Sequence, residues 1–453
     1  MIKRGLLGGI AVAVAFQGLA EPDGWRPLFD DTLSNATFDS SVWSRDADGC
    51  LTATKDMAIW TRDDYSRFEL SCEYNLEPAG NSGILVYCSD TENWIPNSVE
   101  IQLLDNDAPK WKGLNPRQAN LAFFGHQAPK SNPVRPAGEW NRITVRADGS
   151  RLSVVLNGVL VNECDLSAWT DAKRLPDGEA IPSWLSRPWS GLATTGKIGL
   201  QGRHAGAGVR FRNVRIRPLP ATRPVRRVMS YNIRMGCGLN DPFKLGKGSI
   251  GHLPEVAEVI KGFDPDICGI QEIDNKSERA GGVDQTAALA KLCGMEGAWV
   301  EKIPQYGVAM LFRELPFRIS KILVPGSLHT RALMIAEFPG LVFANTHFPL
   351  SETTCENAAR IVCAVLMKEA NGRPVLLVGD MNSTPGSPAM RVLDGAFETL
   401  SDRTVPTWPA TAPDKTIDYI MVDRAHAETF RNARFRSQAA PSATDHVALV
   451  VDL

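Results

Sequence analysis

The sequence predicts two folded domains in one chain: an all-β domain followed by a layered α/β domain. Its 453 residues are too many for one ordinary hydrophobic core. Residues 25–218 carry short alternating or apolar runs separated by Gly, Asn, Asp and Pro, whereas the residues after 226 mix helical and strand-like spacing. Between them, residues 217–225 hold three prolines in nine positions, which predicts a stiff, extended linker.

The first residues have the pattern of a signal peptide. Lys3 and Arg4 form a basic head, Leu6–Phe16 is an apolar run, and Gly18-Leu19-Ala20 offers small residues for cleavage. The apolar run is too short to span a bilayer comfortably, and no later segment has transmembrane character. We therefore expect residues 1–20 to be removed on export, leaving a periplasmic or secreted chain without a transmembrane segment. An uncleaved membrane anchor is the alternative.

Cysteine usage and charge exclude some classes of function. The nine cysteines are an odd number without a CxxC or Cys/His cluster, so no zinc site is predicted. Export permits disulfides, and Cys72 and Cys88 are a candidate pair, but burial as small residues explains the cysteines equally well. A net charge of −2 indicates no bulk attraction to nucleic acid.

Residues 25–218 predict a β-sandwich or jelly roll, because many short strands alternate with turn signals. Asn157-Gly158 is a hairpin signal, since both central residues of such a turn take positive φ. The runs with strand character are Phe68–Tyr74, Gly83–Tyr87, Val99–Leu104, Ile143–Val145, Leu152–Leu156 and Val209–Ile216.

Residues 227–453 predict a layered α/β fold, because helices and strands are mixed. Leu253–Phe263 and Ala358–Glu369 have apolar residues at helical spacing. Strands are expected at Arg227–Ile233, Asp266–Ile273, Leu341–His347, Pro374–Val378 and Val447–Val451.

Polar residues recur where these strands end, which is where an α/β scaffold presents a site. Singly, each motif is weak, since Asp-x-Asn is usually a turn. The motifs in chain order are Ser230-Tyr231-Asn232, Gln271-Glu272, Thr346-His347, Gly379-Asp380-Met381-Asn382, Thr416–Ile420 and Thr444-Asp445-His446. In this order the set resembles the endonuclease/exonuclease/phosphatase superfamily, from about residue 227 to the end. The resemblance implies a four-layered α/β sandwich and a metal-dependent hydrolase acting on ester bonds, a phosphoesterase.

The expected chemistry explains the residue types. A hard divalent cation neutralises the anionic oxygens of a phosphoester, and carboxylate and amide oxygens suit Mg²⁺, with Mn²⁺ as the alternative. By resemblance, Glu272 is the main metal ligand, Asn232 is an outer or direct helper, and Asp445 completes the metal region.

The resemblance also implies the catalytic residues. Asp380 would orient or deprotonate the attacking water, and Asn382 would hold a phosphate oxygen. His446 would contact the phosphoryl oxygen while Asp418 fixes its ring, and His347 would be a second imidazole facing the phosphate. Whether Asp380 or His446 is the general base stays open.

The substrate class follows from charge. Arg331 matches a position that is often basic in small-substrate branches of the superfamily and could bind phosphate, although a surface arginine is the alternative. Residues 221–453 hold 25 Lys+Arg and 26 Asp+Glu, a net of −1, without the basic stripe usual in DNA-binding enzymes. We expect a small, sugar- or lipid-linked phosphoester and no stable nucleic-acid complex. A nuclease is the alternative.

The all-β half has a resemblance of its own. Matching stretches are Trp25–Asp30, Trp60-Thr61, Asn81–Ile84, Val99–Asp105, Gly138–Asn141, Leu156–Gly158, Gly199–Gln201 and Phe211–Val214. They resemble the 3-keto-disaccharide hydrolase family, formerly domain of unknown function 1080, over residues 24–218. The resemblance implies a concanavalin-like jelly roll, and some members cleave or hydrate 3-keto-glycosides. The expected order is signal peptide (1–20), jelly roll (24–218), linker (219–226) and α/β sandwich (227–453).

A sugar site is expected on the jelly roll. Glu100 and Gln102 share a strand face because strand side chains alternate. The candidate residues are Glu100, Gln102, Asp105 and His204, with Asn81 and His126. The family's His usually follows Gln-Asp or Gln-Gly directly, whereas here Arg203 is inserted, which argues against lyase chemistry. We expect binding of carbohydrate; a 3-keto-glycoside lyase or hydrolase and a structural role are the alternatives.

Overall fold

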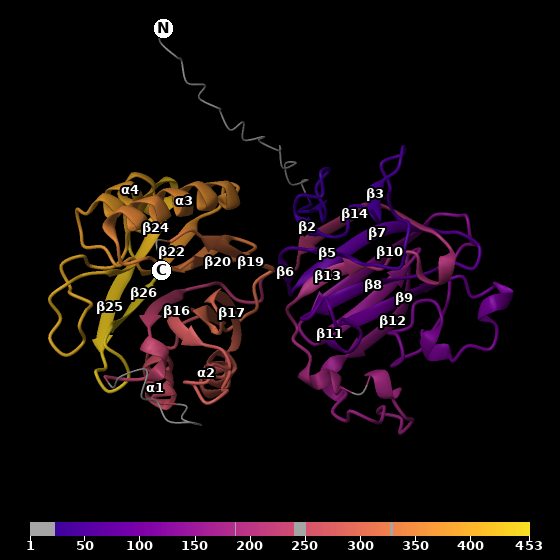
Figure 1. The fold of residues 1–453 in the computed structure, drawn as a ribbon, viewed down its shortest axis with the longest axis horizontal. Coiled ribbons are helices and arrows are strands. Elements are labelled where there is room, and N and C mark those ends of the chain that lie inside the picture. Colours follow the sequence, from indigo (N-terminus) through magenta and orange to yellow (C-terminus); the bar gives the residue numbers. More distant parts are fainter. Residues whose placement is uncertain (1–22, 186, 240–250, 327–328) are drawn as a thin grey trace, which may run out of the picture.

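The computed structural model describes residues 23–185, 187–239, 251–326 and 329–453. Figure 1 shows two domains, the N-terminal one in indigo to magenta and the C-terminal one in magenta to yellow. The predicted signal peptide, residues 1–20, lies outside the described residues. No helix in the described part of the chain combines the length and apolar character needed to cross a bilayer.

The N-terminal domain is a sandwich of two antiparallel sheets, as the strand pattern predicts (Figure 1). The eight-stranded sheet has the order β12 (Val159–Asp165), β11 (Arg151–Leu156), β10 (Asn141–Asp148), β7 (Phe68–Leu76), β14 (Val209–Pro218), β4 (Leu51–Ala53) and β3 (Trp43–Arg45), with β1 (Arg26–Pro27) paired to β14. The five-stranded sheet has the order β2 (Ala36–Thr37), β5 (Ile59–Thr61), β13 (Lys197–Leu200), β8 (Asn81–Cys88) and β9 (Val99–Leu104).

Alternation along the strands builds the core between these sheets. Val99, Ile101 and Leu103 of β9 join the core cluster, so Glu100 and Gln102 face the other side of the sheet. The hairpin expected between β11 and β12 is present, since Asn157 and Gly158 have φ of 49° and 87°. The sequence pattern thus places the two polar side chains on the outer face of the five-stranded sheet.

The C-terminal domain is a four-layered α/β sandwich, with two sheets between two pairs of helices (Figure 1). The six-stranded sheet has the order β17 (Glu296–Ile303), β18 (Tyr306–Phe312), β16 (Ile267–Asp274), β15 (Arg227–Asn232), β26 (Val447–Asp452) and β25 (Arg434–Ala439). The seven-stranded sheet has the order β23 (Phe397–Thr399), β24 (Asp418–Asp423), β22 (Val375–Asp380), β21 (Leu341–His347), β20 (Arg331–Phe338), β19 (Arg318–Val324) and β6 (Asp64–Tyr65).

Three apolar layers hold this sandwich together. Side chains such as Met310, Phe343 and Val378 fill the space between the sheets. A second cluster lies under α1 (Leu253–Phe263) and α2 (Gln285–Cys293), and a third under α3 (Glu352–Ala370) and α4 (Pro388–Ala396). The helix predicted at Leu253–Phe263 has these bounds because Asp264 ends it in the left-handed region, with φ of 49°.

Strand direction gathers the polar motifs at one end of the domain. β15 runs parallel to β16, and β21 runs parallel to β22, so their carboxyl ends share one edge. β24 runs antiparallel to β22 and sets Asp418 opposite Asp380. The motifs that lie far apart in sequence therefore meet between the two sheets.

The N-terminal domain contributes a strand to the C-terminal one. β6 pairs with β19 in the register Arg318↔Tyr65, and the Phe317 ring packs edge-on against Tyr65 with centroids 5.5 Å apart. Buried Glu337 accepts hydrogen bonds from Arg26 of the N-terminal domain at 2.8 Å and from Arg318 at 2.8 Å. Pairing, aromatic packing and ion pairs together join the domains directly.

The predicted linker is anchored along its length. Thr222 donates its backbone N–H to Glu314 Oε1 at 2.9 Å, and the Arg226 N–H donates to Asp266 Oδ2 at 2.7 Å. The cysteines, all nine of them in described residues, are unpaired. The suggested Cys72–Cys88 bridge is not formed, because Cys72 lies in the sandwich core while Cys88 packs beside Trp60 in a separate cluster.

Candidate active site

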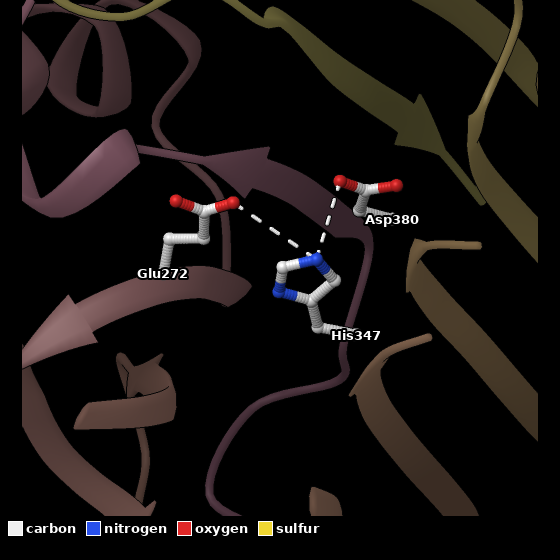
Figure 2. Close-up of side chains that lie close together, drawn as sticks. All are labelled: Glu272, His347 and Asp380. Carbon is white, nitrogen blue, oxygen red and sulfur yellow. Dashed lines mark ion pairs between the residues drawn. The ribbon is translucent and has the colours of Figure 1, made fainter. Parts of the chain in front are cut away.

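Three side chains from neighbouring strand ends converge at the gathered edge. Figure 2 shows Glu272, His347 and Asp380 pointing toward one another. His347 Nε2 lies 3.9 Å from Glu272 Oε1 and 3.6 Å from Asp380 Oδ2. Asn232 completes the group, because its Nδ2 donates to Asp380 Oδ2 at 3.0 Å and to Glu272 Oε1 at 3.3 Å. The amide thus holds two carboxylates side by side.

A bulge in β16 aims Glu272 at this point. The pairing of β16 with β18 shifts register between Gln271 and Ile273, and Glu272 takes φ of 56°. A bulge of this kind turns a side chain away from its regular face. Gln271 stays inside, where its Nε2 donates to Asn345 Oδ1 at 2.6 Å, while Glu272 reaches the partly open site.

A second group of polar side chains, His446 and Asp418, adjoins the first group at Asp380. His446 Nδ1 lies 3.0 Å from Asp418 Oδ2, and its Nε2 lies 3.8 Å from Asp380 Oδ2. Burial alone would lower the pKa of His446, but the charge and hydrogen bond of Asp418, with Asp380 and Asp445, raise it to about 10. Burial and the charge of Asp418 raise the pKa of Asp380. Asp418 therefore fixes His446 as a cation whose Nε2–H faces the site.

This donor set fits a divalent cation. Glu272, His347 and Asp380 form one group with ligand atoms close enough to share an ion, and Asp380, Asp418 and His446 form another. Asp445 adds a buried Oδ1 that has no hydrogen-bond partner. Buried carboxylates need a counter-charge, and hard oxygen donors suit Mg²⁺. Of the residues predicted from sequence as metal ligands, Glu272 belongs to the first group and Asn232 donates to it, while Asp445 Oδ1 lies 3.9 Å from His446 Nε2.

Asn382, predicted to hold a phosphate oxygen, has hydrogen-bond partners within the protein. It has φ of 45°, and its backbone N–H donates to Asp380 Oδ1 at 2.9 Å. Its side-chain Nδ2 donates to the Phe348 carbonyl at 3.0 Å rather than pointing free into the site. In this structure Asn382 stabilises the turn that holds Asp380.

Two cations line the other side of His347. Lys302 Nζ lies 3.2 Å from His347 Nδ1 and 4.1 Å from the centroid of the Tyr306 ring. Arg331, predicted as a phosphate ligand, begins β20, and its buried Nε has no hydrogen-bond partner. Burial, then the charges of Lys302, Arg331 and His446, hold the pKa of His347 well below its usual value, so this ring is neutral.

Lys302 escaped the sequence interpretation, although a signal existed. On β17 it lies two residues after Val300, where the pairing with β18 shifts register between Glu301 and Ile303. Both are buried. A lysine at an inward position of a strand is unusual and marks a candidate functional residue.

The N-terminal domain gathers part of its predicted site on the outer face of the five-stranded sheet. Gln102 Nε2 donates to Asn81 Oδ1 at 2.7 Å, and Oε1 of both Gln102 and Gln201 is buried without a partner. His204 Nδ1 lies 2.5 Å from Asp56 Oδ2. Burial raises the pKa of Glu100 to about 8, and His204 and Asp56 are the charged groups that further affect it.

Two of the predicted sugar residues have partners within the domain, and their contact with sugar stays a prediction. Asp105 Oδ2 accepts the Ala79 N–H at 2.8 Å, so this carboxylate secures a turn. The His126 ring stacks on Trp189 with centroids 3.6 Å apart, and its Nδ1 bonds the Phe124 carbonyl at 3.0 Å. Both roles depend on tertiary neighbours that strand alternation does not show.

Comparisons with known proteins match each domain separately. Residues 24–217 match the 3-keto-alpha-glucoside-1,2-lyase-like domain, and residues 229–446 match the Endonuclease/Exonuclease/phosphatase family. No curated protein matches the chain. A solved structure from Parabacteroides distasonis ATCC 8503, provisionally described as a glycosyl hydrolase, is 45% identical, with 43% of this chain and 99% of that chain covered and a TM-score of 0.42.

Two solved structures are similar to the second domain. The endonuclease/exonuclease/phosphatase from Bacteroides vulgatus is 18% identical over 51% of this chain and 98% of that chain, with a TM-score of 0.41. The mannosyl-6-phosphatase of Bacteroides thetaiotaomicron VPI-5482 is 17% identical over 50% and 98%, with a TM-score of 0.40. The two resemblances drawn from the sequence are confirmed. The chain thus joins an N-terminal domain of the 3-keto-alpha-glucoside-1,2-lyase-like family to a C-terminal domain of the Endonuclease/Exonuclease/phosphatase family.

Proposed function

We propose that the C-terminal domain is a Mg²⁺-dependent phosphoester hydrolase, with Mn²⁺ as the alternative metal. The observation that carries the proposal is the convergence of Glu272, Asp380 and the His446–Asp418 pair at one strand edge. Glu272 and Asp445 would hold the cation with Asn232 as a direct or outer helper, and the Asn232 amide also holds Asp380 next to Glu272. A bound cation would neutralise phosphate oxygens and ease deprotonation of water.

The side chains divide the proton chemistry between them. His446, held as a cation by Asp418, donates from Nε2 to the phosphoryl or leaving oxygen. Asp380 has a raised pKa and is the better acceptor for the proton of the attacking water. We therefore propose Asp380 as the general base, the choice that the sequence leaves open.

We further propose an exported enzyme with a small substrate. The leader pattern of residues 1–20 supports export. The net charge of −1 over residues 221–453, without a basic stripe, supports a small sugar- or lipid-linked phosphoester over duplex DNA and disfavours a nuclease.

The test is hydrolysis by residues 21–453 of an activated phosphoester, with Mg²⁺ and with EDTA. EDTA should abolish turnover and Mg²⁺ should restore it. His446→Ala should lower kcat/KM by about 10²- to 10⁴-fold, the usual range for loss of a general acid–base group. His426→Ala is the matched control, because His426 pairs with Asp423 outside the site. Full turnover in EDTA, or a His446→Ala enzyme as active as the control, would refute the proposal.

A second function is proposed for the N-terminal domain: binding of carbohydrate on the outer face of its five-stranded sheet. The buried, unpartnered oxygens of Gln102 and Gln201 are acceptors that sugar hydroxyls could satisfy. The ring centroids of Trp60 and Trp94 lie 6.5 Å apart near this outer face of the five-stranded sheet. Calorimetric titration with a glucoside and its 3-keto form would test this. Loss of the binding heat in the Gln102→Met variant would support the site. Breakdown of the keto-sugar would point to the lyase or hydrolase alternative.

A further inference from the structure

Lys302 is a buried lysine that forms no ion pair with a described residue, and burial, then the charge of Arg331, lowers its pKa to about 7. Its side chain ends inside the site, and the residue is only 4% exposed. Its contacts are His347 Nδ1 at 3.2 Å and the face of Tyr306 at 4.1 Å. No carboxylate of the described residues forms an ion pair with it. Burying an unpaired ammonium is costly, so the folded chain keeps it there against its own stability.

Arg331 lies beside Lys302 and likewise forms no ion pair with a described residue. Thr330, the residue before it, donates its hydroxyl to the Lys302 carbonyl, which ties the start of β20 to the end of β17. Arg331 Nε is buried without a partner, and the guanidinium forms no ion pair within the described part of the chain. The absence of acid partners is therefore shared by two adjacent cations.

Other arginines near the site are neutralised. Arg279 pairs with Asp274 at 2.7 Å, and Arg234 lies 3.6 Å from Asp445. The contrast shows that the site's acidic residues form no ion pair with Lys302 or Arg331, although the charges of Glu272 and Asp380 act on Lys302 from a greater distance. An anion from outside the chain is the partner that this pair lacks.

His347 lies between this pair and the carboxylates. Its Nε2 faces Glu272 and Asp380, as Figure 2 shows, while its Nδ1 faces Lys302. A phosphoryl group over His347 would meet the carboxylate-bound metal ion on one side and the basic side chains of Lys302 and Arg331 on the other. Lysine and arginine are the side chains that bind phosphate oxygens best.

We propose that Lys302 and Arg331 bind the unsubstituted oxygens of a terminal phosphate, which makes the enzyme a phosphomonoesterase. This rests on the proposed function. A terminal phosphate can reach a buried ammonium end-on, whereas a diester must bring a second carbon-bearing oxygen into that space. A phosphomonoester carries one more negative charge than a diester, and Lys302 supplies a second basic group beside Arg331 for it. In the reaction, water supplies the oxygen of the new P–O bond, the ester P–O bond breaks, and an alcohol and inorganic phosphate leave.

The test uses two esters with one leaving group: 4-nitrophenyl phosphate and methyl 4-nitrophenyl phosphate. The wild-type enzyme with Mg²⁺ should have the higher kcat/KM on the monoester. Lys302→Met and Arg331→Met should each lower that value by about 10- to 100-fold, the effect of losing a charge-assisted hydrogen bond. Their effect on the methyl diester should stay within a few-fold, so the ratio between esters collapses. A wild-type preference for the diester, or equal losses on both esters, would overturn the proposal.

Matched controls and a second readout separate this proposal from the proposed function. Lys261→Met and Arg360→Met remove exposed cations that pair with Glu258 and Glu356 on helices, and should leave the ratio unchanged. Inorganic phosphate should raise the Tm of wild-type protein and not that of Lys302→Met, whether or not any ester turns over. If phosphate binds but no ester is hydrolysed, the phosphate site at Lys302 and Arg331 is supported and the proposed hydrolase activity is rejected. Phosphate binding that survives Lys302→Met would reject the anion site itself. Since Lys302→Met removes an unpaired buried charge, its ligand-free Tm should not fall.

Discussion

Two residues of the candidate active site hold backbone conformations that L-residues rarely adopt. Glu272 has φ of 56° and Asn382 has φ of 45°. Asparagine tolerates this region, but glutamate adopts it only where its surroundings force it, and such strain concentrates at functional sites. The strain at Glu272 is maintained by the register shift of β16 and by the Asn232 amide. The position of Glu272 is thus fixed by backbone and partner together.

Replacing Asp418 tests how the orientation of His446 matters. Asp418→Asn removes the charge that raises the pKa of His446, so the imidazolium loses its proton at lower pH. We expect kcat to fall by about 10- to 1000-fold with little change in KM. The alkaline limb of the kcat–pH profile should move to lower pH. Profiles from pH 5.5 to 9.5 would be compared with Asp414→Asn, an exposed control. An unshifted alkaline limb would contradict this role.

Most of the site residues could be predicted because the sequence marks them locally. Asp380, Asp418 and His446 each stand at a strand end, and the strands are recognisable from their apolar runs. Lys302 and Asp105 show the limit. The partners that decide their roles, His347 and Ala79, are set by packing between distant segments. Alternation gives the face of a strand but not what lies against it.

At the scale of elements, two glycines of the five-stranded sheet leave space for larger side chains on its outer face. A Cβ at Gly83 would lie 2.6 Å from Glu100 Oε1, and one at Gly199 would lie 2.5 Å from the Trp60 ring. The absent side chains let the carboxyl group and the indole lie flat on neighbouring strands. The sequence predicts β9 with its observed bounds, Val99–Leu104, but the role of these glycines needs the strand register.

The burial of Glu100 on this face predicts a pH dependence of stability. The folded state keeps the proton of Glu100 up to about pH 8, whereas the unfolded chain releases it near its ordinary value of 4.5. The free energy of unfolding should therefore fall as pH rises between these values, by at most about 1.4 kcal/mol per pH unit. Glu100→Gln should remove this slope. Urea unfolding at pH 5 to 8 would show it, and an equal slope in both proteins, with exposed Glu92→Gln as control, would contradict it.

At the scale of the whole molecule, one buried carboxylate links the two domains. Glu337 accepts hydrogen bonds from Arg26, Arg318 and Arg373, and Arg318 also pairs with Asp63 of the jelly roll at 2.7 Å. Burial would raise the pKa of Glu337, but the three guanidinium groups outweigh it and lower the pKa. The domains are therefore expected to unfold as one cooperative unit.

Glu337→Gln should uncouple that unit. The change removes the carboxylate charge that pairs with part-buried Arg26 and Arg373, while Arg318 keeps Asp63 and Glu369, and breaking such a pair typically costs up to about 3–5 kcal/mol. Calorimetry should show one transition in the wild type and two in the variant, with Glu398→Gln, an exposed change, as the control. Because the pKa of Glu337 is lowered, its contribution is complete above about pH 4.5 and is lost as pH falls further. A single transition in Glu337→Gln at neutral pH would refute the coupling.

The interface between the two domains could not be predicted from the sequence. Asp64-Tyr65 is too short for a strand signal, and its partner β19 lies some 250 positions further along the chain. Proline content predicts a stiff linker, yet the anchoring of Thr222 and Arg226 depends on Glu314 and Asp266. The organisation within each domain follows from local pattern, whereas the contact between them is a matter of surface complementarity.

The pairing of β6 with β19 has a consequence for any shortened form of the protein. A chain that began after the linker would leave the backbone of Arg318 and Ile319 open and the Phe317 ring, now part of the jelly-roll core, in water. Open edges of this kind are templates on which strands of other molecules assemble. The jelly roll thus acts as an intramolecular guard, covering an edge that would otherwise promote self-association of the neighbouring domain.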